Sequence, residues 1–138
     1  MKDLSNSITL KRVISPVSVA DTTAQVGTAV DRKGFESVTY AIATGSIADA
    51  DATFTVLLQE SDDNSTYTDV ADADLLGTEA LAGFQFDDDN ECRKLGYIGA
   101  KRYTKLTITP VVNARAALIS AVAILGHAAA KPTVNPPA

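Results

Sequence analysis

Apolar and polar residues alternate along residues 102–110, and this two-residue period is the feature that most limits what the chain can fold into. Leu106 and Ile108 fall on one side of an extended backbone, whereas Lys105 and Thr107 fall on the other. Successive side chains of a β-strand point to opposite faces, and threonine and isoleucine suit a pleated surface. The stretch therefore predicts a strand with one buried side.

The same period recurs along most of the chain, between polar turns such as 31–34, 61–65 and 87–90. Predicted strands cover residues 7–15, 22–30, 36–44, 53–60, 83–86, 91–98, 102–110 and 117–125. The one helical segment that we consider in this otherwise all-strand pattern is a short helical turn at residues 70–75. Because a half-apolar strand must cover its apolar side, we expect an all-β fold: a two-sheet antiparallel β-sandwich, jelly-roll-like, of about eight strands. A small closed barrel is the structural alternative.

Residues 117–125 are apolar on both sides of the predicted strand. Leu118 and Val122 alternate with Ile119, Ala121 and Leu125. Such a strand is either central in its sheet or has its second face covered by another subunit.

Prolines and the chain ends suggest the domain limits. Pro16 and Pro110 lack the backbone donor that a strand ladder needs, so we expect each to end its strand. Residues 1–16 are then an N-terminal arm or first strand, residues 17–127 the sandwich domain, and residues 128–138 a flexible tail containing three prolines. Extended arms at both ends follow from this division.

Composition excludes several classes of protein. With 138 residues and 46% hydrophobic residues, one domain can form a core without disulfides. The net charge of -5 argues against general nucleic-acid binding, which needs a basic surface. Cys92, the single cysteine, precludes an internal disulfide, and no apolar run is long enough to suggest a membrane span. Acidic residues concentrate between 49 and 89 and basic residues toward both ends, which suggests either solvated faces or subunits meeting through opposite charge.

No residue pattern predicts catalysis, so we expect no enzyme. His127 is the only histidine, has no evident orienting partner in the sequence, and is expected to be an ordinary surface or strand-end residue. Cys92 follows an acidic residue, which disfavours a reactive thiolate, and we expect it to be buried.

Two binding chemistries stay open beside that expectation. The acidic stretches could supply oxygen ligands to Ca²⁺, although none fits a known loop pattern and we expect no metal or other cofactor. They are 49–51, 62–64, 72–74 and 87–89. Tyr40, Tyr67, Tyr97 and Tyr103 could form a sugar-stacking platform, but Tyr40 and Tyr97 share the parity of core residues.

Several stretches together resemble a family of small structural proteins of tailed bacteriophages and prophages, encoded near the major capsid gene. The resemblance runs through the segments 14–17, 21–32, 34–42, 48–56, 73–80, 94–99, 101–103, 106–110 and 121–127. It covers most of the chain and is weakest around residues 61–72. The family supplies no catalytic residues.

The resemblance implies a virion protein that assembles in the bacterial host cytoplasm. The first expectation is a head decoration, or cement, protein that binds and stabilises the capsid shell. Its partners would be the major capsid protein and further copies of itself, as a trimer rather than a dimer, without nucleic acid or membrane. The alternatives are a carbohydrate- or receptor-binding module displayed as a head fibre, and a neck or tail-completion protein.

Subunit or capsid contacts are expected on the first and last predicted strands, because the doubly apolar strand and the N-terminal arm are the segments free to reach a partner. The candidate residues are Ile8, Leu10, Arg12, Leu118, Ile119 and Leu125.

Overall fold

A computed structural model describes residues 2–136. These residues form eleven strands, six of them long and five of two residues each. The strands are β1 (Thr9–Val19), β2 (Gln25–Val26), β3 (Val30–Asp31), β4 (Phe35–Ile47), β5 (Thr53–Ser61), β6 (Thr68–Asp69), β7 (Leu75–Leu76), β8 (Phe84–Gln85), β9 (Cys92–Tyr97), β10 (Tyr103–Val111) and β11 (Ala117–Ala128). The helical segments are η1 (Ser5–Ser7), η2 (Asp72–Asp74) and α1 (Glu79–Ala82).

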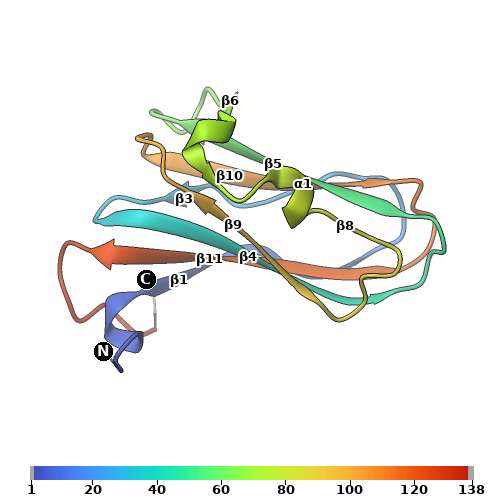
Figure 1. The fold of residues 1–138 in the computed structure, drawn as a ribbon, viewed down its shortest axis with the longest axis horizontal. Coiled ribbons are helices and arrows are strands. Elements are labelled where there is room, and N and C mark those ends of the chain that lie inside the picture. Colours follow the sequence, from blue (N-terminus) through green and yellow to red (C-terminus); the bar gives the residue numbers. More distant parts are fainter. Residues whose placement is uncertain (1, 137–138) are drawn as a thin grey trace.

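The strands form two antiparallel sheets packed face to face, so the predicted sandwich is confirmed and the barrel alternative is wrong (Figure 1). Sheet A has the order β1-β11-β4-β9-β7. Sheet B has the order β2-β10-β5-β6, with β3 also paired to β10 and β8 also paired to β5. Most neighbours in each sheet are far apart in the sequence, so the layers depend on long-range pairing rather than on local hairpins.

The core lies where the alternating residues of the two sheets meet. On β10, Leu106, Ile108 and Thr104 point inward and are fully buried, as the alternation predicts. The Thr104 hydroxyl lies 2.6 Å from the phenol oxygen of Tyr40 on β4, which joins the sheets by a buried hydrogen bond. The two hydroxyl groups that β4 and β10 carry into the core at this point thus satisfy each other.

Neither proline ends its strand, contrary to the prediction. Pro16 lies within β1, an edge strand whose pairing with β11 shifts register between Arg12 and Ile14 and again between Ile14 and Val17. Edge strands and bulges are where a missing donor is tolerated. Pro110 lies opposite Phe54 on β5. Leu58, which has the same parity as Phe54, directs its N–H to Glu79 and its C=O to Val70, and so away from β10. Pairs of this parity therefore do not exchange hydrogen bonds, and the missing donor of Pro110 costs the ladder nothing.

Alternation along residues 7–15 places Ile8, Leu10 and Ile14 on one side, and the bulges in β1 break this pattern. Thr9, Val13 and Ile14 are buried, whereas Leu10 is 49% exposed. In the predicted strand 22–30, Val30 is buried but Val26 is 62% exposed. The reason is a break after Val26: residues 27–29 leave the ladder and bridge the sheets.

Gly27 makes that bridge possible. Its N–H donates to the Leu106 carbonyl at 2.7 Å, and the next N–H, of Thr28, donates to the Val13 carbonyl at 2.9 Å. A Cβ atom at position 27 would lie 2.6 Å from both the Leu106 oxygen and a Val13 methyl carbon. Only glycine allows β1 and β10 to approach this closely.

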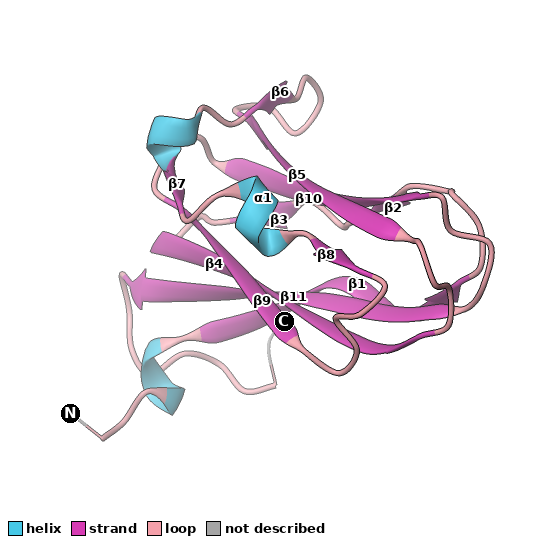
Figure 2. Cartoon of the chain, turned by 45° about the vertical axis from the view of Figure 1, so that its right-hand side comes forward, coloured by secondary structure: helices cyan, strands magenta, loops and turns pink. Residues whose placement is uncertain are grey.

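Short elements cover the side of the sandwich between β5 and β9 (Figure 2). The α1 helix begins at Thr78, whose side chain accepts a hydrogen bond from the Leu81 N–H, and it contacts β5 of sheet B and β9 of sheet A. The predicted helical turn at 70–75 corresponds to η2 at its centre. Phe84 of β8 stacks on Phe54, with ring centroids 4.7 Å apart.

The described ends of the chain lie together at one end of the sandwich (Figure 1). The Thr133 N–H donates to the Asn6 carbonyl at 3.0 Å, and the Ala129 N–H donates to the Gly34 carbonyl at 2.9 Å. The C-terminal segment that the sequence predicts as a flexible tail is therefore folded back on η1 and on the turn before β4 over its described residues.

Candidate functional site

The outer face of sheet A, which points away from the core, carries several exposed apolar residues from neighbouring strands. Strand register places Leu10 beside Ile124, Ile124 beside Thr39, Thr39 beside Gly96, and Gly96 beside Leu76. The exposed or half-buried apolar side chains of this face are Leu10, Ala41, Ala43, Leu76, Leu118, Val122 and Ile124. Contiguous exposed apolar surface of this kind marks interaction sites.

Two cationic side chains lie on this face, each from a different strand. Arg12 of β1 lies beside Val122, and Lys94 of β9 lies beside Ala41, which is the other neighbour of Val122. Arg12 donates to the Ser15 hydroxyl at 2.5 Å. Among the residues that the structure describes, the outward positions of β1, β4, β9 and β11 hold no carboxylate. The face is therefore apolar and positively charged.

Its size covers part of one side of a protein interface. Four long strands at about 4.8 Å spacing, and about six residues along each at about 3.3 Å, give roughly 19 by 20 Å, to which the two-residue β7 adds a little at one edge. Specific protein interfaces bury about 800 Å² on each partner. The flat face alone provides roughly 400 Å², about half of that area, so a partner would also have to contact the strand ends around it.

Three of the six predicted contact residues lie on this face: Leu10, Arg12 and Leu118. Ile8 is half-buried beside Gly126. Ile119 and Leu125 are 2% and 0% exposed, so their prediction as partner contacts is corrected: they are core residues. The doubly apolar strand β11 is central, and it directs one of its two apolar sets inward and the other, with Leu118, outward.

Sequence reasoning missed Lys94 and Leu76 as members of the face. Both come from strands that lie far from residues 117–125 in the sequence and are brought there by the order β11-β4-β9-β7. The outward parity of Lys94 could have indicated exposure, but strand order was needed to place it beside Val122.

The two predicted titratable candidates lie on or beside this face: Cys92 is paired with Ala43, and His127 follows Gly126 near the end of β11. His127 is exposed, and its Nδ1 lies 2.9 Å from the Ser37 hydroxyl. Cys92 is exposed, not buried as predicted, because Leu95 and Tyr97 occupy the inward parity of β9. Over residues 2–136, no three His, Cys, Asp or Glu side chains are grouped so that they could hold a metal ion. The described residues include no helix long and apolar enough to cross a membrane.

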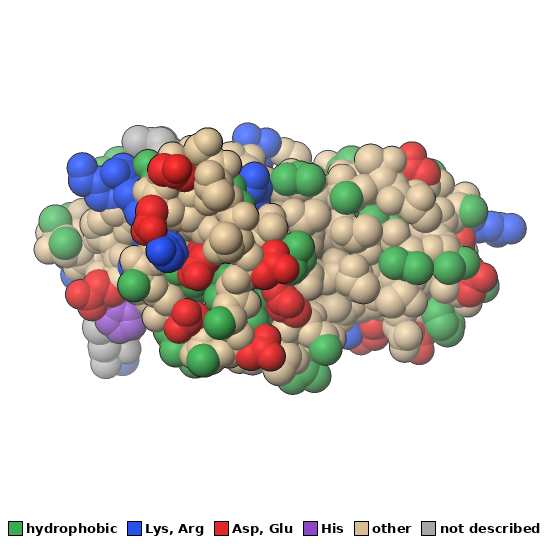
Figure 3. Space-filling view, turned by 90° about the horizontal axis from the view of Figure 1, so that it is seen from above, with side chains coloured by type: hydrophobic (Ala, Val, Ile, Leu, Met, Phe, Trp, Pro, Cys, Tyr) green, Lys and Arg blue, Asp and Glu red, His purple; other side chains and the backbone are tan. Residues whose placement is uncertain are grey.

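The tyrosines divide as their parity predicts. Tyr40 and Tyr97 are buried, whereas Tyr67 and Tyr103 are half-buried near the outer face of sheet B. The Lys105 ammonium lies 4.0 Å from the centroid of the Tyr67 ring. Figure 3 shows this side of the molecule, on which hydrophobic side chains are scattered rather than gathered. The two outer faces therefore differ in chemistry.

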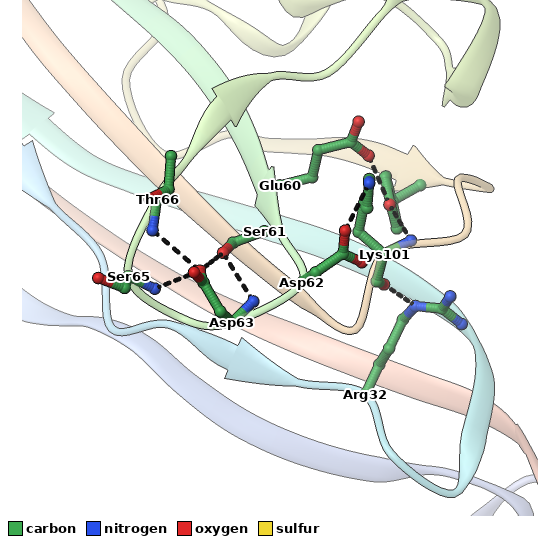
Figure 4. A network of polar contacts seen from close by, with 9 residues as sticks. Arg32, Glu60, Ser61, Asp62, Asp63, Ser65, Thr66 and Lys101 are labelled. Carbon is green, nitrogen blue, oxygen red and sulfur yellow. Dashed lines mark hydrogen bonds and ion pairs between the residues drawn. The ribbon is translucent and has the colours of Figure 1, made fainter.

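At the end of the sandwich near the chain termini, a polar network joins the turns after β3, β5 and β9 (Figure 4). The Tyr97 phenol donates to Glu60 at 2.6 Å and accepts from the Lys101 N–H at 3.0 Å, while the Lys101 ammonium donates to Asp62 at 2.6 Å. Burial is the main cause that raises the pKa of Tyr97. The network fixes the turns after β5 and β9 against each other.

Within the same network, the acidic turn after β5 has its own internal bonds. The Asp63 carboxylate accepts from the N–H groups of Ser65 and Thr66 and from the Ser61 hydroxyl, at 2.9–3.0 Å. The Thr66 N–H is the main cause that lowers the pKa of Asp63. Turn formation therefore accounts for this part of the acidic stretch.

Asp49 predicts a pH dependence of stability. A hydrogen bond from the Asp51 carboxyl, together with those from the Ala114 and Asp51 N–H groups, lowers the pKa of Asp49 to about 2, and the same carboxyl pair raises the pKa of Asp51. A lowered pKa stabilises the fold above the ordinary value of about 3.9, and this stabilisation is lost as the pH falls toward about 2. The raised pKa of Asp51 has the opposite effect on stability: its stabilising contribution is present at low pH and is lost as the pH rises through its folded pKa.

Thermal unfolding across this pH range checks the prediction. Asp49→Asn is expected to lower the Tm at neutral pH, and its difference from wild type should shrink as the pH approaches about 2. Asp51→Asn is the comparison, because an amide can donate to Asp49 at every pH, whereas the Asp51 carboxyl donates only while it is protonated. A constant Tm difference for Asp49→Asn would contradict the proposed role of its charge.

Comparisons with known proteins give the fold. No family model and no curated protein matches the chain. The structure of the PBSX exported protein XepA matches with a TM-score of 0.59 and 16% sequence identity, over 98% of this chain and 42% of XepA. This chain thus spans less than half the length of XepA. At this identity the match shows a shared fold and not a shared function.

Two further structures match less well. The SPBc2 prophage-derived protein YomS has a TM-score of 0.44 at 15% identity, covering 85% of this chain and 92% of YomS. The CBM22-1-GH10 modules of Clostridium thermocellum xylanase Xyn10B have a TM-score of 0.47 at 10% identity, covering 95% of this chain and 28% of that one.

Proposed function

We propose that the protein is a non-enzymatic structural protein of a tailed-phage particle that binds the head shell through the outer face of sheet A. The observation that carries the proposal is that face: five large apolar side chains are exposed or half-buried there, with Arg12 and Lys94 as its two charges. The phage setting comes from the sequence resemblance. The mode of binding comes from the chemistry of the face.

The face defines what its partner must offer. Apolar side chains that leave water on both partners provide the affinity, and carboxylates opposite Arg12 and Lys94 provide orientation. A capsid shell built from one repeated protein would present such a surface many times. A flat, rigid sheet is suited to lie against it, because little conformational entropy is lost when a preformed surface binds.

Binding to undecorated heads tests the proposal. Heads of the phage that encodes this chain, assembled without it, would be mixed with the purified full chain and separated by sedimentation. We expect saturable binding at a fixed ratio of copies per shell, and shells that withstand heat or chelator better when coated. Absence of binding at both low and physiological salt would refute the proposal.

A carbohydrate-binding role is the second candidate, and the position of Tyr67 and Tyr103 favours it. The two half-buried rings lie near one end of the outer face of sheet B, beside Lys105 and Gln59. Aromatic rings with nearby polar groups are suited to sugar stacking and hydrogen bonding. A glycan screen tests it: binding that both Tyr67→Ala and Tyr103→Ala abolish would support this candidate over shell binding.

A further inference from the structure

The end of the sandwich opposite the chain termini carries more acidic than basic side chains. Four loops meet at the end opposite the chain termini: residues 20–24, 48–52, 86–91 and 112–116. Hydrogen bonds tie them together, including Ala114 N–H to Asp49 and Asn113 Nδ2 to the Asp21 carbonyl. These loops hold seven carboxylates and a single cation, Arg115. Arg93 of β9 pairs with two of these carboxylates, Asp88 and Glu91, and the end keeps a net negative charge.

An aromatic side chain projects from the acidic end. Phe86 is 40% exposed, whereas its neighbour in the predicted strand, Phe84, is buried against Phe54. Asp87 and Asp89, which follow Phe86 in the turn, are exposed. The turn thus presents one ring followed by carboxylates, although alternation along residues 83–86 placed Phe84 and Phe86 on one face.

The opposite end has a groove around Phe35, which is half-buried at the start of β4. One hollow of about 370 Å³ lies between Phe35, Thr9 and the folded-back tail at Pro132 and Val134. A cavity of about 150 Å³ already admits a benzene ring, so this hollow has room for a phenyl side chain. We call these residues the Phe35 groove.

Cations flank the Phe35 groove. Lys131 and Lys33 line two further hollows that share Phe35, of about 470 and 420 Å³. The carboxylates beside these hollows are Glu36 and Asp31, and Asp31 is paired with Arg102 at 2.7 Å. In Figure 3, Lys and Arg side chains lie mostly toward this end, where Asp and Glu side chains are also present. An apolar hollow between two lysines fits an aromatic residue followed by aspartates.

We infer that a second copy of this chain occupies the groove: Phe86 of one copy enters the Phe35 groove of the next, and Asp87 and Asp89 face Lys33 and Lys131. The two complementary surfaces lie at opposite ends of one molecule, so each copy offers both halves of the contact. Such a head-to-tail contact produces a closed ring or an open chain rather than a two-fold dimer. This inference is independent of shell binding, which uses the face of sheet A.

Sedimentation of the full chain tests self-association. At low salt and concentrations up to about 1 mM, the wild-type protein is expected to sediment as species larger than a monomer. Phe86→Ala, and separately the pair Lys33→Glu with Lys131→Glu, should each lower the association constant at least about tenfold. Leu81→Ala is the control, because Leu81 is 72% exposed on α1 and outside both surfaces.

A mixture of the two defective proteins distinguishes a head-to-tail contact from any other. Phe86→Ala keeps an intact groove, and the double lysine variant keeps an intact Phe86, so together they can form one contact and no more. A 1:1 dimer in the mixture, with each variant monomeric alone, is the expected result. The inference is overturned by a monomeric wild-type protein, by variants that still associate, or by a mixture without the dimer. A monomeric wild type whose shell binding falls on Phe86→Ala substitution would assign Phe86 and the acidic end to the shell contact and would also overturn the inference.

Discussion

Phe54→Ala is expected to lower the free energy of unfolding by about 4 kcal/mol, because it removes a large side chain from a closed core and leaves a cavity. Phe54 is 1% exposed, and its ring lies nearly parallel to that of Phe84, with an interplanar angle of 13°. Such a pair adds about 1 kcal/mol beyond the buried area. Urea-induced unfolding measured by circular dichroism would give the difference.

Leu57→Ala is the matched control for Phe54→Ala. Leu57 lies three residues after Phe54 on β5, points outward and is half-buried. Its truncation should therefore lower the free energy of unfolding by about 1 kcal/mol or less. A loss below about 2 kcal/mol for Phe54→Ala would mean that the site collapses around the smaller side chain.

The stack also bears on self-association. β8 pairs with β5 only at Thr53 and Phe54, and β8 leads directly into the turn that carries Phe86. Removing Phe84 or Phe54 should therefore loosen the position of Phe86.

Because the rings of Phe54 and Phe84 contact each other, the free energy of unfolding of the double alanine variant is expected to fall by about 1 kcal/mol less than the sum of the losses in the two single variants.

The long central strands could be predicted from parity alone. Alternation along 36–44 and 53–60 places Val38, Ile42 and Leu58 on the apolar sides of their strands, and all three are buried. Strict alternation works there because both strands pair without bulges along their cores. β1 was predicted less well, since its two register shifts exchange the faces of Leu10 and Thr9, and bulges leave no clear mark in the residue pattern.

The candidate face could be predicted only in part, for a different reason. Residues 117–125 indicate two apolar sides, but the sequence does not say which side faces the second sheet. Which side of β11 faces the second sheet is set by the pairing of β11 with β1 and β4, a long-range property of the fold. The same pairing brings Lys94 near Arg12 across two strands, so the charge of the face is a consequence of strand order.

Leu118→Asp is expected to lower the affinity for undecorated heads at least about 100-fold if the face of sheet A is the binding surface. Leu118 is 46% exposed and packs over Gly45 at the edge of the face, so the isolated fold should tolerate the change. In the bound state, however, its carboxylate would be buried among apolar side chains. A buried unpaired charge costs several kcal/mol, which is enough for this loss.

Thr55→Asp is the matched control for Leu118→Asp, because Thr55 is exposed on the outer face of sheet B and the substitution changes the net charge equally. Sedimentation of labelled protein with heads would measure both variants, and thermal unfolding would confirm that both are folded. Arg12→Glu with Lys94→Glu should also weaken binding, and more strongly at low salt, because exposed charges are screened over about 10 Å at 0.1 M. Equal affinities of Leu118→Asp and wild type would show that the shell contacts another surface, since no apolar interface admits a new carboxylate without loss.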